Sequence, residues 1–146
     1  MWLQDFEIGQ TFESPPLRVD ADMIREFAAR YDPQPFHLDS EAAERSVFGG
    51  LVASGWHTAA LTMQLFVPYG PQIEGGTIGL SAEELRWSAV RPGDELRLHV
   101  EVVEVKPSTS RPDRGIVRLR SRTLNQRDEE AQHMVVSVLV PARTDG

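Results

Sequence analysis

An apolar segment near the middle of the chain limits the folds that the sequence can adopt. Over residues 51 to 67, large apolar side chains recur with small ones between them, which predicts a helix buried on most of its circumference. The large positions are Leu51, Val52, Leu61, Met63, Leu65, Phe66 and Val67, and the small ones are Ala53, Gly55, Ala59 and Ala60. Such a helix requires a cover on nearly all sides, and a curved antiparallel sheet provides one.

The C-terminal half of the chain supplies strands for this sheet. Residues 95 to 106 alternate apolar and polar side chains, the pattern of a half-buried strand. Other strands are expected around residues 83 to 87, 116 to 124 and 134 to 140, with turns at 91 to 94 and 125 to 128. The predicted fold class is α+β, with a curved antiparallel sheet wrapped around a long central helix, and residues 1–146 form a single domain.

The N-terminal half predicts elements that surround the central helix. Pro15 and Pro16 indicate an edge strand or a strap, because consecutive prolines cannot donate to a central ladder. Asp20 is a good N-cap for a helix over residues 21 to 31, and a short helix follows from Asp39 or Ser40 through Arg45. A loop of about a dozen residues, 68 to 79, follows the central helix, and loops of that length often bind ligands.

The composition excludes several classes of function. A formal net charge of −7 argues against nucleic acid as a partner, and the lack of cysteine excludes disulfides and thiolate chemistry. The four histidines show no metal-ligand spacing, so no metal is predicted. No signal peptide is recognised at residues 1 to 5, and the longest apolar stretch is too polar to span a bilayer. We therefore expect a cytoplasmic protein without a membrane partner.

A carboxylate and an imidazole stand five residues apart in the segment RYDPQPFHLD, residues 30 to 39. Pro33 and Pro35 predict that residues 32 to 36 are extended or turned, so Asp32 and His37 lie on a stiff loop. Such a pair can hold a water molecule and act as general acid and base. The alternative is that Asp32 caps a turn and His37 is a surface histidine, because this spacing is common in sequences.

A second candidate feature is the predicted start of the central helix. Ser54 and Gly55 lie near its first turn, where free N–H groups and the partial positive charge of the helix stabilise an oxyanion, and a glycine lets a carbonyl approach. The alternative is that Gly49, Gly50 and Gly55 only permit a tight bend and close packing.

These residues together carry a resemblance. The run Tyr31-Asp32-Pro33-Gln34-Pro35-Phe36-His37-Leu38-Asp39, then Phe48-Gly49-Gly50 and Ala53-Ser54-Gly55, resembles the MaoC-like dehydratase family of hotdog proteins, the (R)-specific enoyl-CoA hydratases, with their D-x-N-P-x-H signature. The resemblance implies that Asp32 and His37 hold the catalytic water and that the Gly55 amide binds the thioester carbonyl. Gln34 replaces the usual Asn and Ser54 the usual His, and both are expected to contact the substrate and to alter its selection.

The resemblance implies an acyl-CoA hydro-lyase, which hydrates trans-2-enoyl-CoA to (R)-3-hydroxyacyl-CoA and catalyses the reverse reaction. The CoA belongs to the substrate, so no separate cofactor is implied. Two alternatives stay open: a non-catalytic acyl-CoA-binding hotdog module and a hotdog thioesterase. A single sheet of this kind leaves an open edge, so a homodimer or a higher homo-oligomer is expected.

Several other residues allow two interpretations. Arginines 111, 114, 118, 120 and 122 either pair with carboxylates or bind the phosphates of coenzyme A. His57 is interpreted as a packed helix residue rather than a third catalytic group, His99 as facing solvent and His133 as having no evident partner. Trp56 and Trp87 are expected in the core or in the wall of a groove.

Overall fold

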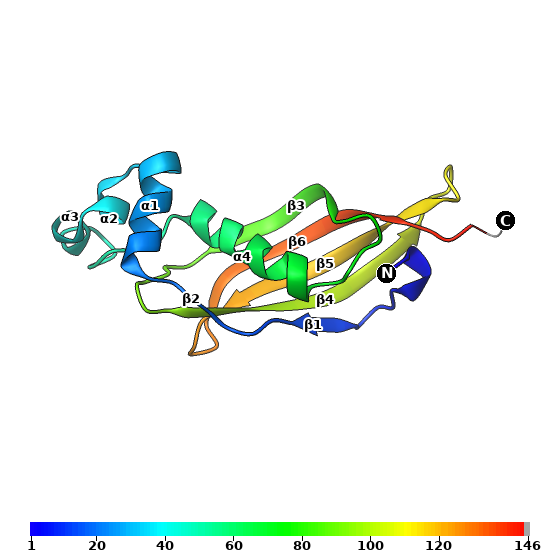
Figure 1. The fold of residues 1–146 in the computed structure, drawn as a ribbon, viewed down its shortest axis with the longest axis horizontal. Helices are drawn as coiled ribbons and strands as arrows, with labels where there is room; N and C mark the ends of the chain where they lie inside the picture. The colour runs from blue at the N-terminus through cyan, green and yellow to red at the C-terminus, as the bar shows by residue number, and fades with distance from the viewer. Residues whose placement is uncertain (145–146) are drawn as a thin grey trace.

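The computed structural model describes residues 1–144, with a long helix across one face of a sheet and three shorter helices at one end (Figure 1). The helical elements are η1 (Leu3–Asp5), α1 (Ala21–Tyr31), α2 (Pro35–Leu38), α3 (Ser40–Glu44) and α4 (Gly55–Tyr69). The strands are β1 (Thr11–Glu13), β2 (Leu17–Arg18), β3 (Ile78–Trp87), β4 (Glu95–Pro107), β5 (Arg114–Leu124) and β6 (Glu130–Pro141).

The sheet is antiparallel throughout, in the order β1-β4-β5-β6-β3, and β2 also pairs with β4. The polar turns predicted at residues 91 to 94 and 125 to 128 are confirmed, and the second joins β5 to β6, which pair with each other. β1 and β2 lie on either side of Pro15 and Pro16 and form the predicted strap. The predicted α+β class and hotdog arrangement are thereby confirmed (Figure 1).

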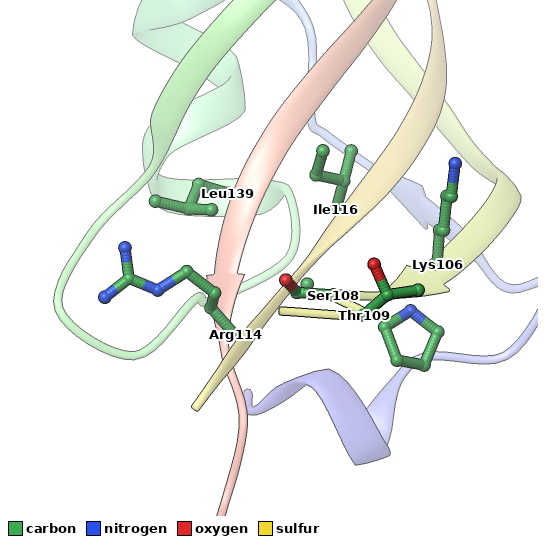
Figure 2. A pocket seen from close by; sticks show the side chains of 8 residues that line it. Lys106, Ser108, Thr109, Arg114, Ile116 and Leu139 are labelled. Atoms are coloured by element: carbon green, nitrogen blue, oxygen red, sulfur yellow. The ribbon is translucent and has the colours of Figure 1, made fainter. Parts of the chain in front are cut away.

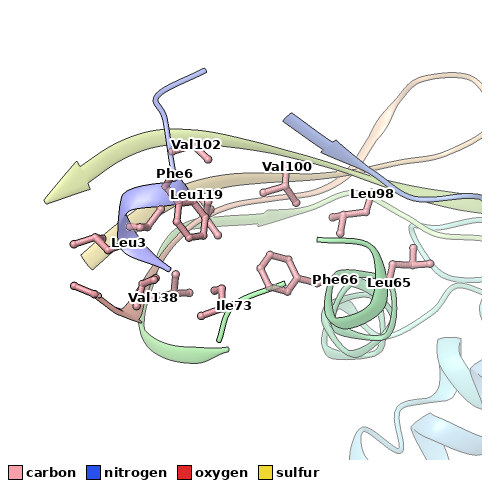
Figure 3. Packing of buried hydrophobic residues seen from close by; sticks show 13 residues of the cluster. Leu3, Phe6, Leu65, Phe66, Ile73, Leu98, Val100, Val102, Leu119 and Val138 are labelled. Atoms are coloured by element: carbon pink, nitrogen blue, oxygen red, sulfur yellow. The ribbon is translucent and has the colours of Figure 1, made fainter. Parts of the chain in front are cut away.

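The main core lies between α4 and the sheet face beneath it. Leu65 and Phe66 of α4 pack against a cluster of valines and leucines that point to this face from β4, β5 and β6, as Figure 3 shows. A second cluster joins α1 to the first half of α4 through Ile24 and Leu61. The alternation predicted for the strands places these residues inward, because successive side chains of a strand point to opposite faces.

Helix α4 differs from the prediction in two respects. It begins at Gly55, and Leu51 and Val52 precede it in an extended segment whose Val52 N–H donates to the Phe36 carbonyl at 3.2 Å. Its outer face is exposed at Met63 and Val67, so the prediction of burial on most of the circumference is wrong for the single chain. The physical reason is that the sheet covers one side of α4 only, and periodicity does not specify what covers the other side.

Two loop predictions differ in their bounds from the structure. Residues 32 to 34 form the predicted extended or turned loop, whereas Pro35 already occupies the first position of α2, where its missing N–H costs no helical hydrogen bond. Helix α4 continues through Pro68 to Tyr69 and β3 begins at Ile78, so the connection between them is shorter than predicted. No helix in the part of the chain described, residues 1–144, is long and apolar enough to cross a membrane.

Candidate active site

Asp32 and His37 are brought together by the junction between α1 and α2. Asp32 follows the last residue of α1, and its N–H still donates to the Ala28 carbonyl at 2.9 Å. Pro35 then starts the single turn of α2, which carries His37 back toward the end of α1. Nε2 of His37 lies 3.3 Å from Oδ2 of Asp32, so the structure places the two predicted groups side by side.

The backbone fixes which nitrogen of His37 is available for proton transfer. Nδ1 lies 2.6 Å from the carbonyl oxygen of Val52. A carbonyl only accepts hydrogen bonds, so Nδ1 carries a proton, and Nε2 is the nitrogen that faces Asp32 and can exchange a proton. The His37 side chain is 6% exposed and that of Asp32 is 19% exposed, which leaves access to solvent on the carboxylate side.

The Asp32 carboxylate is held in its ionised form. A hydrogen bond from the Ser54 side chain is the largest cause of a lowered pKa of Asp32, the Gln34 amide and His37 lower the pKa further, and partial burial opposes them. The Gln34 amide donates to Oδ1 of Asp32 at 2.6 Å. Gln34, expected to border the substrate, therefore also orients the carboxylate.

Ser54 is placed differently from the expectation. It is fully buried, and it is not among the residues that line the pocket beside the Asp32–His37 pair. Ser54 is the N-cap of α4, and its hydroxyl oxygen accepts a hydrogen bond from the Trp56 N–H at 3.3 Å. The proton of the same hydroxyl is available to Asp32. Ser54 thus links the start of α4 to the carboxylate from behind the pocket.

A pocket of about 380 Å³ contains the Asp32–His37 pair and the first residue of α4. Its lining comprises Asp32, Gln34, Phe36, His37, Phe48, Val52, Ala53, Gly55, Trp56, Trp87, Ser88 and Ala89. Within residues 1–144 the Gly55 N–H has no acceptor, and it lies at the positive end of the α4 dipole. Two proton-transfer groups and a free N–H donor therefore share one pocket, an arrangement suited to adding or removing water next to a carbonyl.

The family model described as "MaoC like domain" matches residues 5–123. The chain belongs to this family. Among solved structures it is similar to the MaoC-like dehydratase from Rhodospirillum rubrum, with 50% identity, a TM-score of 0.95 and 99% of each chain covered. It is also similar to the (R)-hydratase from A. caviae involved in PHA biosynthesis, with 30% identity, a TM-score of 0.75, and 94% of this chain and 99% of that chain covered.

Two relatives are similar in sequence. The uncharacterized protein YdeM of Bacillus subtilis (strain 168) is 36% identical over 143 residues, which cover 96% of this chain and 99% of the relative. The 3-hydroxybutyryl-CoA dehydratase of Methylorubrum extorquens is 29% identical over 112 residues, which cover 76% of this chain and 69% of the relative.

The walls of the pocket in this MaoC-like chain were only partly predicted. Trp56 and Trp87 line it, in agreement with a groove wall, whereas Phe36 and Phe48 were not singled out in the sequence. Phe36 contacts His37 edge-on, with ring centroids 4.6 Å apart. Its position within the D-x-x-P-x-H run was the available signal, because Phe36 stands between the proline and the histidine and directly precedes the imidazole in the chain.

The other histidines lie outside this pocket. His57 is buried and stacked on Phe27 with centroids 4.6 Å apart, and burial, followed by the charge of His37, lowers the pKa of His57. His99 is half-buried, 3.7 Å from Glu13, rather than fully solvent-facing. His133 was expected to lack a partner but is buried, with Nδ1 3.2 Å from the Glu84 carbonyl oxygen. Residues 1–144 contain no cluster of three potential metal ligands.

The arginines of residues 108 to 122 follow the ion-pair interpretation. Each lies within salt-bridge distance of a carboxylate: Arg111 and Arg114 of Asp113, Arg118 of Glu83 and Glu104, Arg120 of Glu101, and Arg122 of Glu130. On β5 the buried Val117 and Leu119 face α4, so the alternating arginines face the other side of the sheet. A separate pocket of about 280 Å³, which Figure 2 shows with Lys106 and Arg114 at its rim, lies at the hairpin end, away from α1–α3.

Proposed function

We propose that this chain is an acyl-CoA hydro-lyase that hydrates trans-2-enoyl-CoA to (R)-3-hydroxyacyl-CoA and catalyses the reverse reaction. The observation that carries the proposal is the pairing of an ionised Asp32 with a buried His37 whose Nε2 faces it, in one pocket with the free Gly55 N–H. The hydratase and dehydratase names of similar proteins support this reaction class.

In the hydration direction, a water molecule donates one hydrogen bond to the Asp32 carboxylate and one to Nε2 of His37. Nε2 accepts a proton while the water oxygen forms a bond to C3 of the enoyl group, and the C2=C3 electron pair moves toward the thioester carbonyl. The Gly55 N–H and the helix dipole stabilise the negative charge on the carbonyl oxygen. Nε2 then returns its proton to C2, and the neutral ring is restored.

The remaining residues support this chemistry by holding its parts in place. The Val52 carbonyl fixes the His37 tautomer, and the Gln34 amide together with the Ser54 hydroxyl keeps Asp32 ionised and stationary. Asp32 in turn stabilises the imidazolium that forms when Nε2 accepts the proton. In this scheme no group other than the substrate's own coenzyme A is required.

We further propose that the functional unit is a homodimer. Among residues 1–144, β3 ends the sheet and pairs only with β6, and its residues are exposed along most of its length. Apolar side chains are exposed on this strand, at Ile78 and Leu80, and also on α4, at Met63 and Val67. Pairing β3 of two copies would satisfy the free backbone groups of the edge, and it would also cover these side chains.

The test is a comparison of wild type with Asp32→Asn and His37→Gln on a panel of enoyl-CoA thioesters. Loss of the absorbance of the conjugated thioester reports hydration, release of free thiol reports a thioesterase, and binding with neither signal reports a non-catalytic module. Each substitution should lower kcat by about 10² to 10⁴, the usual contribution of a general acid or base. His99→Gln, which alters a second histidine–carboxylate pair, is the matched control. Near-wild-type activity of either variant would refute the assignment.

A further inference from the structure

Trp87 is held against the first residue of α4. It is the last residue of β3, it is 40% exposed, and it lines the pocket with the Asp32–His37 pair. A Cβ atom built on Gly55 would lie 2.4 Å from Cε3 and 2.5 Å from Cδ2 of the indole, closer than real Cβ contacts. The indole therefore occupies the space that any side chain at position 55 would need, and it touches the backbone that carries the Gly55 N–H.

A buried amide on the neighbouring strand fixes the orientation of this indole. Trp87 lies opposite Gln132 of β6, and its Nε1–H donates to Oε1 of Gln132 at 2.8 Å. Gln132 is 0% exposed, and within residues 1–144 its Nε2 has no partner, so this is the one hydrogen bond that its side chain makes. Burying an amide is unfavourable unless its groups are bonded, so the bond to Trp87 is the evident reason for a glutamine at this position.

The second indole completes an aromatic wall. Trp56, 59% exposed, meets Trp87 edge-on, with centroids 4.8 Å apart and an interplanar angle of 76°. Phe36 and Phe48 also line the pocket, and none of its described lining residues is Lys or Arg. The pocket thus offers flat apolar surfaces and no cation for a carboxylated acyl group.

We propose that Trp87, anchored by Gln132, is both a positioning residue and a specificity-determining residue. As a positioning residue it fixes the location of the Gly55 N–H. As a specificity-determining residue it favours acyl groups whose conjugated plane extends beyond C3, such as 3-aryl-2-enoyl thioesters. This inference rests on the proposed hydro-lyase function. The planar group packs on the indole while C3 faces the Asp32–His37 pair. Because extended conjugation favours the alkene, the assay of such substrates runs in the dehydration direction, from the 3-hydroxy-3-aryl thioester.

The experiment compares Trp87→Leu, Trp87→Phe and Gln132→Met with wild type on 3-hydroxy-3-phenylpropanoyl-CoA and on 3-hydroxybutyryl-CoA. In Trp87→Leu, kcat/KM should fall about three- to tenfold more for the phenyl substrate than for the butyryl substrate. This factor corresponds to the interaction energy of one aromatic pair. Gln132→Met should lower kcat on both substrates by about tenfold or more at little-changed KM, because it frees the indole that positions Gly55. Trp2→Phe, which alters the indole before η1, is the control and should change neither value.

A second measurement separates this inference from the proposed function. Affinity for the unreactive 3-phenylpropanoyl-CoA, relative to butyryl-CoA, should fall in Trp87→Leu whether or not any substrate turns over. If wild type dehydrates neither substrate, but Trp87→Leu binds 3-phenylpropanoyl-CoA with a smaller preference over butyryl-CoA than wild type does, the hydro-lyase proposal fails. The role of Trp87 in selecting the acyl group is then still supported. If wild type is active and Trp87→Leu and Trp87→Phe keep its ratio of phenyl to butyryl substrate, the role of Trp87 is refuted. Should Trp87→Leu fail to fold by circular dichroism, Trp87→Phe and Gln132→Met decide the positioning role by their kcat.

Discussion

Replacing Ser54 with alanine should destabilise the protein by an amount that depends on pH. The Ser54 hydroxyl caps α4 by accepting from the Trp56 N–H, and the Ser54 side chain is also the largest cause of the lowered pKa of Asp32. Loss of a Ser N-cap costs about 0.5–2 kcal/mol of the free energy of unfolding. For a chain of this length that corresponds to a Tm lower by about 1–8 °C.

The pH-dependent part follows from the lowered pKa of Asp32. A carboxyl whose pKa is lower in the folded state contributes stability that is present above its unfolded pKa of about 3.9 and is lost as the pH falls through the folded value. Ser54 is the largest cause of the lowered pKa, so Ser54→Ala raises it toward the ordinary value. The difference in stability between wild type and Ser54→Ala should therefore be largest at neutral pH and narrow below about pH 3.9.

Urea unfolding of both proteins between neutral pH and the acid range measures this difference. Carboxylates elsewhere titrate equally in the two proteins and cancel. Ser54→Thr, which retains a hydroxyl, should keep most of the stability. In an Asp32→Asn background the effect of Ser54→Ala should become independent of pH, because the titrating partner is gone. The reasoning is refuted if the difference does not vary with pH, or if the same variation persists in the Asp32→Asn background.

Three further predictions concern the surroundings of the carboxylate, the helix start and the sheet edge. Gln34→Glu should move the acid limb of the pH profile of kcat/KM to higher pH, because a second negative charge raises the pKa of Asp32. Gln34→Asn should move the acid limb less, and an unshifted limb in Gln34→Glu would contradict the contact between residue 34 and Asp32. Gly55→Ala should lower kcat by about tenfold or more, because the new Cβ would collide with Trp87 and displace the N–H donor of residue 55. Unchanged steady-state kinetics would exclude the contact between Gly55 and Trp87. Light scattering should give a mass near twice the 16.4 kDa of one chain, and Leu80→Glu on the edge strand β3 should reduce this mass to that of one chain. A wild-type mass equal to that of one chain would exclude the dimer.

The parts of this site that sequence predicts are those held by local structure. Asp20 caps α1 through the Met23 N–H as expected, and the turn between α1 and α2 is built by two prolines. The four residues between Asp32 and His37 leave few ways to separate the two side chains, so their proximity follows from the chain itself. The strands followed from alternation because one face of the sheet is buried and the other is not.

The parts that sequence does not predict depend on register between distant strands. Gly55, Trp87 and Gln132 meet only because β3 and β6 pair in a register that sets Trp87 opposite Gln132, and a slip of one residue would turn the indole to the other face. Burial of α4 was overestimated for a related reason. Met63 and Val67 are apolar but exposed, because the sheet covers only one side of α4, and the spacing of apolar residues does not show which of them the sheet covers.

The two departures from the family signature change the carboxylate more directly than they change the space around a substrate. Gln34 donates to one oxygen of Asp32, His37 faces the other, and Ser54 supplies the strongest of the contacts that keep the group ionised. The expectation that Ser54 contacts the substrate and alters its selection does not fit its complete burial behind the pocket. We therefore expect acyl selection to depend on the aromatic side of the pocket, and we expect Gln34 and Ser54 to set the pH range of the proposed reaction through the pKa of Asp32. If Ser54→Ala changed the ranking of acyl groups but not the acid limb of the pH profile, this division of roles would be reversed.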